Sequence, residues 1–573
     1  MRRPAIIFAL ITVGALSCSI VMEHNAQFEK LAHNFFEGLF SFNPEWATNL
    51  GDHRFDHLLN DYTPEAIAKE KSFYLAYLDS LDRIDPQKLN ETNRVDYRIF
   101  KNQIQSSYFE MDTLRGYEWN PLSYNQGGAI YSLTSREFAP LPDRMRDVME
   151  RLKAIPIRLE QARINLNRPP RVFTETAIRQ NQGTINMVRD ELKSYLDQVP
   201  SLALEFGPVQ ERAIGALEEY GRWLENDLLP ISDGDFRLGD AKYRAKLRYT
   251  LHSDLSKEEI LERAQQDLVK TQNDIYAVAL PLYKKFFPEG SGDIENRKKV
   301  VKSVLDRLAE DRPNAENVVE FAEICLKMCS DFVGEKNLVT VPDEPINIIV
   351  MPEFLRGVAV AYCDSPGPLE KEGKTFYAIS PPPSYWDDSR VESYFREYNN
   401  YMMWDLTIHE AMPGHYLQLA HSNLFKAPTM IRAVFGSGAF TEGWATYAEE
   451  LMVEHGFGGA EAKMQQLKMR LRMIINAIID QKIHTEGMSE SEAMRMMQDE
   501  GFQEEGEAAG KWIRACLSST QLSTYYIGNI EINDIRRAYA AKYGRDFDLR
   551  SFHDKLLSYG SPPPKYVKEI MGL

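Results

Sequence analysis

Apolar side chains recur at helical spacing through most of the first 335 residues. One stripe consists of Phe28, Leu31, Phe35, Phe36 and Leu39. Residues three or four apart share one face of an α-helix, so the stripe predicts a helix with one buried face. A second stripe runs through Leu268, Ile275 and Val278. The helix it predicts ends before Pro281, because proline clashes with the turn that precedes it.

The pattern changes after residue 335. Segments 346–350, 357–362 and 375–380 are short, rich in β-branched residues and bounded by proline or glycine, which predicts a small sheet. A helix is expected next, over residues 396–412. Its apolar positions include Tyr398, Tyr401, Met402, Leu406 and Met412. We find no low-complexity linker and no internal repeat.

Length, composition and charge limit the classes of function that this chain can have. The chain has 573 residues, 43% of them hydrophobic, which is enough to bury a large core. Its formal net charge of −17 argues against nucleic-acid binding, since phosphate contacts need a basic surface. Beyond Cys18, the cysteines Cys325, Cys329, Cys363 and Cys516 lack the paired spacing of a zinc ribbon, and we expect no required disulfide.

The first 18 residues have the pattern of an export signal. Arg2 and Arg3 precede an apolar stretch, 5–16, which is too short for a transmembrane helix but suits a signal peptide. Residues 15–18, Ala-Leu-Ser-Cys, resemble a bacterial lipobox with Cys18 as the lipidated residue. An ordinary cleaved secretion signal is the alternative. Both predict an exported protein, periplasmic or in the cell envelope, and the lipobox predicts a lipid anchor.

The strongest chemical signal is His-Glu-Ala-Met-Pro-Gly-His at 409–415. On an unbroken helix, residues six apart lie about 240° around the axis and about 9 Å along it, too far for two bonds to one metal ion. Pro413 removes an amide hydrogen and Gly414 tolerates almost any backbone angle, so the helix is expected to break there. The break lets His415 return to the face of His409.

A carboxylate supplies the third ligand of the predicted site. Glu442 lies on a helix that begins near Ala439, and His409, His415 and Glu442 make the ligand set of a catalytic zinc ion, with water in the fourth position. Glu410 is the predicted general base. Asp405 and Glu449 are candidates to accept the second ring N–H of a histidine ligand. His421 is a rival ligand.

Four blocks of this sequence resemble a known family. They are H-E-A-M-P-G-H-Y-L-Q at 409–418, G-A-F-T-E-G-W-A-T-Y-A-E at 438–449, I-I-D-Q-K-I-H at 478–484 and Y-Y-I-G at 525–528. The chain resembles the bacterial domain of unknown function 885 family, grouped with the gluzincin metallopeptidases. The resemblance implies a mostly helical zinc peptidase, with His409, His415 and Glu442 as ligands and Glu410 as base. Asn476 departs from the arginine expected at that position.

Further residues are candidates for contacts with a substrate. His484 and Tyr525, from the third and fourth blocks, could donate a hydrogen bond to the oxyanion of amide hydrolysis. His484 could equally complement a helix dipole, and Tyr525 could be a packing aromatic. Arg356 and Arg390 are candidate anchors for a substrate carboxylate. An edge strand of the small sheet could pair with a peptide backbone, or the sheet could merely pack on the helices.

Together these features predict a mostly α-helical, gluzincin- or oligopeptidase-like fold. Two helical halves surround a deep cleft, with a small β-sheet beside the zinc-binding helix. The expected division is a signal segment at 1–18, a helical half at 19–335 and a catalytic half at 336–573. The predicted function is an exported zinc metallopeptidase for short peptides, a carboxypeptidase or dipeptidase among the options. The alternatives are a zinc hydrolase of a non-protein amide and a non-catalytic peptide-binding lipoprotein.

Overall fold

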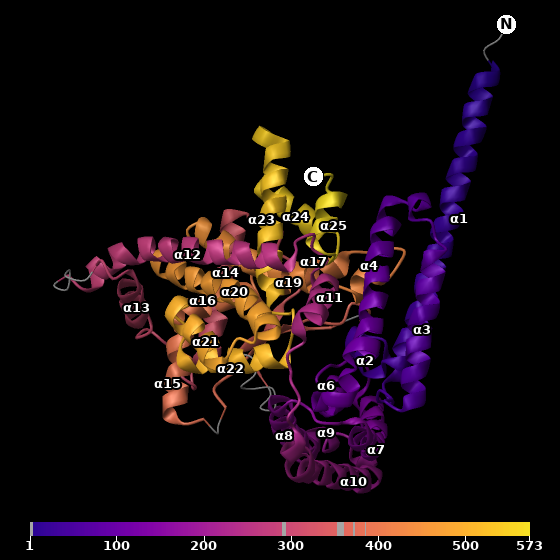
Figure 1. The fold of residues 1–573 in the computed structure, drawn as a ribbon, viewed down its shortest axis with the longest axis horizontal. Helices are drawn as coiled ribbons and strands as arrows, with labels where there is room; N and C mark the ends of the chain where they lie inside the picture. The colour runs from indigo at the N-terminus through magenta and orange to yellow at the C-terminus, as the bar shows by residue number, and fades with distance from the viewer. Residues whose placement is uncertain (1–3, 289–293, 352–359, 371–372, 384–385) are drawn as a thin grey trace.

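The computed structural model describes residues 4–288, 294–351, 360–370, 373–383 and 386–573, and it is mostly helical with one small sheet (Figure 1). The helices before the sheet are α1 Pro4–Phe42, α2 Pro44–Leu50, α3 Pro64–Asp82, α4 Glu91–Phe109, α5 Gly116–Trp119, α6 Gly127–Thr134, α7 Leu141–Asn165, α8 Arg171–Asn186, α9 Leu192–Leu196, α10 Ala203–Trp223, α11 Gly239–Leu251, α12 Lys257–Phe286, α13 Arg297–Leu308 and α14 Val318–Lys336.

The helices after the sheet carry the predicted site. They are α15 Asp388–Glu397, α16 Asn400–Glu410, α17 His415–Leu424, α18 Ile431–Val434, α19 Gly438–Glu454, α20 Gly459–Glu486, α21 Glu490–Arg495, α22 Glu505–Leu517, α23 Ser523–Tyr543, α24 Leu549–Leu557 and α25 Pro564–Ile570. In Figure 1 they occupy the orange and yellow part of the molecule, opposite the indigo and purple helices α1–α10.

The sheet has the strand order β1-β3-β2, with β1 Ile346–Val350 parallel to β3 Thr375–Ile379 and β2 Ala361–Asp364 antiparallel to it. The predictions for β1 and β3 are confirmed to within one residue. The predicted second strand, 357–362, overlaps only the start of β2, and its first three residues lie outside the described ones. Ala361, Tyr377 and Ile379 pack in one core with residues of α14 and α16, so the sheet supports the helix that carries His409.

Helix α12 continues through Pro281, so the predicted end before this residue is wrong. Pro281 and Ala277, whose carbonyl loses its amide partner, are both exposed to solvent. Water can satisfy that carbonyl, while Ile275, Ala279 and Leu282 on the opposite face keep the helix in the core. A proline is thus tolerated where its missing hydrogen bond faces water.

The hydrophobic cores do not divide at residue 335. Helices α11, α12 and α13 share a core with α20, α22 and α23, whereas residues 124–228 form a core of their own. Contacts also run between the two parts: Arg136, which follows α6, donates to the backbone oxygens of Ser365 (2.8 Å) and Lys374 (3.1 Å). The division into 19–335 and 336–573 stays a prediction.

Helix α1 includes the apolar stretch predicted as a signal segment. Among the residues that the structure describes, no helix combines the length and apolarity needed to span a bilayer. The thiols of Cys325, Cys329, Cys363 and Cys516 are free. Cys325 and Cys329 are buried on one face of α14, as their spacing of four predicts.

Candidate metal centre

The two histidines of the motif lie on two helices that meet at Pro413-Gly414. Asn399 caps α16 by accepting hydrogen bonds from the amides of Tyr401 and Met402, both at 3.2 Å. The helix ends at Glu410, where the backbone of Ala411 leaves the helical region, and α17 begins at His415. The predicted break is confirmed. The predicted span 396–412 is too long at both ends. At its start α15 still includes Glu397, and at its end α16 stops at Glu410.

Gly414 allows the chain to fold back on the end of α16. A Cβ atom at this position would lie 1.9 Å from the carbonyl oxygen of His409 and 2.3 Å from that of Ile408, so no other residue fits without movement of the backbone. Trp444, from α19, donates its indole N–H to the carbonyl of Pro413 at 2.8 Å. The close approach of Gly414 to α16 and the hydrogen bond from Trp444 therefore both stabilise the break.

His409, His415 and Glu442 converge on one point. Their candidate ligand atoms all lie within 4.8 Å of one another. Oε2 of Glu442 is 3.6 Å from Nε2 of His409 and 3.4 Å from Nε2 of His415, and the two imidazole rings are nearly perpendicular with centroids 4.7 Å apart. The three predicted ligands thus form the one such group among the described residues.

This group fits a divalent metal ion such as zinc. Bonds of about 2.0–2.1 Å in a tetrahedron place neighbouring ligand atoms about 3.3 Å apart, close to the observed separations. Oε2 of Glu442 is buried and has no hydrogen-bond partner among the described residues. Burial raises the pKa of Glu442, but the two histidines outweigh it and hold the pKa well below its usual range. The carboxylate is therefore ionised, as a metal ligand must be.

Glu449 orients the first histidine. Its Oε1 lies 2.6 Å from Nδ1 of His409, and the carboxylate is buried two turns after Glu442 on the same helix. This leaves Nε2 of His409 directed at the group, which is the arrangement of histidine ligands in metal sites. Asp405, the other candidate, makes no hydrogen bond in the described part of the chain. Burial and the charge of Glu449 raise its pKa well above the usual value.

Glu410 lies between the ligands and the sheet. Its Oε2 accepts the backbone N–H of Cys363 in β2 at 3.2 Å. Burial raises the pKa of Glu410, while the neighbouring His415 and His409 lower it, and burial prevails. A partly buried carboxylate of raised basicity beside a candidate metal centre has the properties of a general base.

Tyr525 lies beside His409, with ring centroids 6.3 Å apart and planes 27° apart. Its hydroxyl accepts a hydrogen bond from Arg514 at 2.9 Å. A contact between glycines positions it: a Cβ on Gly443 would lie 2.4 Å from the carbonyl carbon of Gly528, so α19 and α23 touch backbone to backbone. Gly443 follows Glu442 and Gly528 is three residues after Tyr525, so this contact sets Glu442 and Tyr525 close together.

Two other predicted histidines face elsewhere. Nε2 of His484 lies 3.1 Å from the carbonyl oxygen of Ala515 and 2.8 Å from that of Ser518, and its ring stacks on Tyr243. No hydrogen bond or ring contact in the described part of the chain joins it to the three ligands, so the structure does not bring His484 to the group. Nε2 of His421 lies 2.7 Å from the carbonyl oxygen of Thr340, which leaves it outside the ligand set.

The candidate carboxylate anchors have mixed outcomes. Arg356 lies outside the described residues. Arg390 stacks over Trp386 at 4.7 Å and lines a cavity beside the ligands. Asn476 is buried in α20 with its Oδ1 unpaired within the described residues.

Lys511 and Arg514 line the same cavity as Arg390, and neither was identified from the sequence. Their spacing of three on one helix was the available signal, but it is too common to indicate a site.

Comparison with known proteins agrees with the four sequence blocks. Residues 44–571 match the family described as "Bacterial protein of unknown function (DUF885)". The chain belongs to this family. No curated protein matches this DUF885 chain. It is similar in structure to a "putative lipoprotein of unknown function" from Shewanella oneidensis, with TM-score 0.80 and 33% identity over 95% of this chain and 100% of the other. A "putative lipoprotein" from Colwellia psychrerythraea has TM-score 0.77 at 17% identity, over 96% and 98% of the chains, and shows the fold alone.

Proposed function

We propose that this DUF885 protein is an exported, zinc-dependent metallopeptidase that hydrolyses short peptides. The observation that carries the proposal is the convergence of His409, His415 and Glu442, with ligand atoms within 4.8 Å of one another and Glu449 on the far nitrogen of His409. Three ligands with a fourth position left for water distinguish catalytic from structural zinc sites.

The reaction assigns a role to each side chain. His409, His415 and Glu442 would hold a zinc ion, which would supply Lewis acidity and make a water molecule more acidic. Glu410 accepts the proton of the attacking water and passes it to the leaving amine. Tyr525 donates its hydroxyl hydrogen to the developing oxyanion. Burial and the charge of Glu442 hold the pKa of Tyr525 well above its usual value, so the hydroxyl keeps its proton.

The surroundings support a short peptide as substrate. β2 is an edge strand whose Cys363 amide contacts Glu410, so an extended peptide beside it would run past the general base. Arg136 brings the N-terminal helices against the same region of the sheet. We infer that the helical halves flank a deep, gluzincin-like cleft that excludes folded proteins.

The proposed cellular location follows from the N-terminal sequence pattern. Arg2 and Arg3, the apolar stretch and Cys18 favour export with a lipid on Cys18, and the similar chains from Shewanella and Colwellia carry the description lipoprotein. Substitution of Cys18 by Ala should move the protein from the membrane fraction to the soluble fraction. Equal fractionation of both proteins would contradict the lipid anchor.

Metal analysis and a peptide library test the activity. The purified protein should contain about one zinc ion per chain and release amino acids or short peptides from the library. A chelator should stop the release and added zinc should restore it. The Glu410→Gln variant should still bind zinc but should no longer release amino acids or peptides from the library. Peptide binding without hydrolysis would instead support the non-catalytic alternative, and turnover of non-protein amides alone would support the other zinc hydrolase.

A further inference from the structure

A cavity beside the metal centre has an aromatic wall and a cationic wall. The aromatic wall consists of Trp386, Tyr394 and Tyr398 on and next to α15, and the cationic wall contains Lys511 and Arg514 on α22. Apolar walls that bury a ligand, with a few convergent charges, are the usual composition of a binding site.

One face of α22 forms the cationic wall. Glu507, Lys511 and Arg514 are four and seven residues apart and share this face with Gly510. A Cβ atom on Gly510 would meet nothing within 4 Å, so the helix leaves open space at this glycine. The cavity is therefore accessible along the backbone of α22.

Arg514 links the cavity to the metal centre through its contact with Tyr525. Arg514 donates to the hydroxyl of Tyr525 at 2.9 Å, and the Tyr525 ring lies 6.3 Å from that of His409. The charge of Glu442 also acts on both Lys511 and Arg514. The side chain of Tyr525 thus lies between the guanidinium group of Arg514 and the predicted metal ligand His409.

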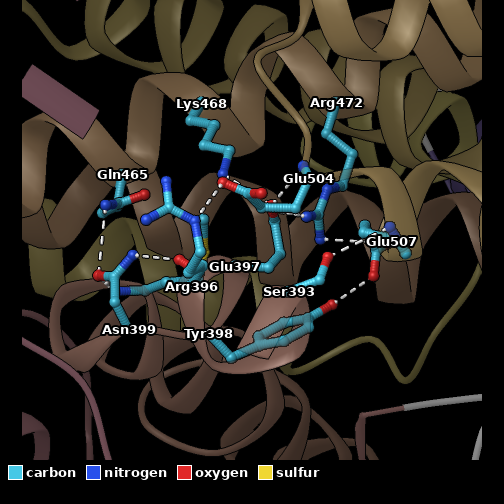
Figure 2. A network of polar contacts seen from close by, with 12 residues as sticks. Ser393, Arg396, Glu397, Tyr398, Asn399, Gln465, Lys468, Arg472, Glu504 and Glu507 are labelled. Carbon is cyan, nitrogen blue, oxygen red and sulfur yellow. Dashed lines mark hydrogen bonds and ion pairs between the residues drawn. The ribbon is translucent and has the colours of Figure 1, made fainter. Parts of the chain in front are cut away.

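The carboxylates around the cavity already have cationic partners. Figure 2 shows Glu397 between Lys468, at 2.8 Å, and Arg472. Glu507 accepts from the hydroxyl of Tyr398 at 2.8 Å and lies 3.5 Å from Arg472 and 3.8 Å from Lys511. The cavity lining and its ion-pair partners therefore contain two carboxylates and five cations, Arg390, Lys468, Arg472, Lys511 and Arg514, which leaves an excess of positive charge.

Arg514 lines the cavity without an ion-pair partner among the described residues, as does the more exposed Arg390. The hydrogen bonds of Arg514 go to neutral acceptors, the side-chain oxygen of Gln521 at 3.1 Å and the hydroxyl of Tyr525. No carboxylate among the described residues lies within ion-pair distance of its guanidinium. The guanidinium is partly buried, and the charges of Glu442 and Glu507 act on it only from beyond ion-pair distance, so an anionic ligand in the cavity can pair with it directly.

We propose that the cavity binds the free C-terminal carboxylate of the substrate, with Arg514 and Lys511 as its anchors. This inference rests on the proposed function and makes the protein a carboxy-terminal exopeptidase. A guanidinium matches the two oxygens of a carboxylate, and the aromatic wall accommodates the terminal side chain. An extended residue spans about 3.3–3.6 Å, so a peptide cut at the metal centre reaches Arg514 within about one to three residues.

Matched peptides test the anchor. One peptide is prepared with a free C-terminus, with an amidated C-terminus, and amidated with a glutamate near the cut. The protein should cleave the free acid with a kcat/KM about 10- to 100-fold above that of the amidated peptide, because a hydrogen-bonded charge pair is lost. Mass spectrometry should find one to three residues released from the C-terminus. Equal cleavage of the first two peptides, or a preference that follows the internal glutamate, would overturn the terminal assignment.

Variants separate the anchor from a role in holding Tyr525. Arg514→Gln should lower kcat/KM for the free acid about 10- to 100-fold and change that for the amidated peptide less than about threefold. Equal losses on both peptides would show that Arg514 only positions Tyr525, and would overturn the proposal. Arg537→Gln is the matched control, since Arg537 pairs at the surface of α23 with Asp534. It should change neither value.

Gly510→Leu tests the cavity without removing a charge. Leucine favours a helix more than glycine, so the variant should fold, and its side chain would enter the open space. It should lower kcat/KM for the free acid at least about tenfold. An unchanged value would overturn the cavity as the binding site.

A binding measurement separates this inference from the proposed function. If the protein cleaves none of the peptides, the hydrolytic proposal fails. Calorimetry on the zinc-loaded Glu410→Gln variant then still decides the anchor. The free acid should bind at least about tenfold more tightly than the amide, and an added Arg514→Gln substitution should abolish the difference. Equal affinities would overturn the anchor.

Discussion

Two glutamates in the C-terminal part of the chain, the buried Glu397 and the partly buried Glu442, differ in how their oxygens are paired. Glu397 uses both oxygens: Arg472 reaches one, and Lys468 and the amide of Glu504 reach the other at 2.8 and 2.9 Å (Figure 2). Oε2 of Glu442 has two imidazoles at 3.4 and 3.6 Å and no hydrogen bond within the described chain. Removal from water is costly for both carboxylates.

The difference separates a structural cluster from a candidate site. Around Glu397 the protein provides the counter-charges itself, and the cluster joins α15, α20 and α22. Around Glu442 it provides electron-pair donors at separations too long for hydrogen bonds and suited to a metal ion. Burial alone therefore does not indicate a site, whereas burial with unpaired, convergent ligand atoms does.

The largest expected effect tests the chemistry at the Glu442 cluster. Glu410→Gln should lower peptide turnover about 10²- to 10⁴-fold, because an amide cannot accept the proton of water. The amide oxygen can keep the hydrogen bond from Cys363, so the fold and the metal content should not change. Turnover assays and elemental analysis of the same sample check both. Turnover close to that of the unchanged protein would refute Glu410 as the base.

The next effect tests the Glu397 cluster. Glu397→Gln should destabilise the protein by about 3–5 kcal/mol, since Lys468 and Arg472 would remain buried with an uncharged partner. Denaturant unfolding measures the loss, and the zinc content should stay the same. Glu392→Gln on the same helix is the control. Its partner Arg312 is partly exposed, and the change should cost less than about 1 kcal/mol. Similar losses in both variants would remove the distinction between the clusters.

A smaller effect is expected at the far side of His409. Glu449→Gln should weaken zinc affinity about 10- to 100-fold, because a carboxylate that accepts the second ring N–H makes imidazole a better ligand. Competition with a chromophoric chelator measures the affinity. Glu450→Gln is a neighbouring control, since Glu450 contacts Arg470 and Asn533 and should not affect the metal. An unchanged affinity in the Glu449 variant would show that His409 needs no such partner.

The smallest effect is expected at Asp405. Burial and the charge of Glu449 favour its neutral form, which asparagine resembles in shape and charge. Asp405→Asn should therefore change the unfolding free energy by less than about 1 kcal/mol and leave zinc affinity unaltered. Denaturant unfolding and chelator competition measure the two values. A loss above about 2 kcal/mol would indicate an ionised Asp405 that the fold depends on.

The sequence was most informative where the physics is local. The break at Pro413-Gly414 follows from the missing amide and the missing Cβ, and the structure places His409, His415 and Glu442 together as expected. The strands β1 and β3 follow from β-branched runs bounded by proline and glycine. The break and the strands are each encoded within a few neighbouring residues, whereas Glu442 lies on a later helix and was predicted from the second sequence block.

Features that depend on distant contacts were not predictable. Glu397 contacts Lys468, Arg472 and Glu504, which are 71, 75 and 107 residues away, so no spacing reveals the cluster. His484 belongs to the third sequence block, yet its place on α20 directs it to the carbonyls of Ala515 and Ser518 and away from the candidate site. Pro281 was misjudged because its effect depends on whether its side of α12 faces water.

The contact between Gly443 and Gly528 has a consequence for protein engineering. Glu442 and Tyr525 lie on helices whose backbones touch at these two glycines, so the contact fixes the distance between the helices. New functional groups could be introduced at positions 442 and 525 without a change in that distance. Enlarging either glycine would instead wedge the helices apart and shift both groups at once.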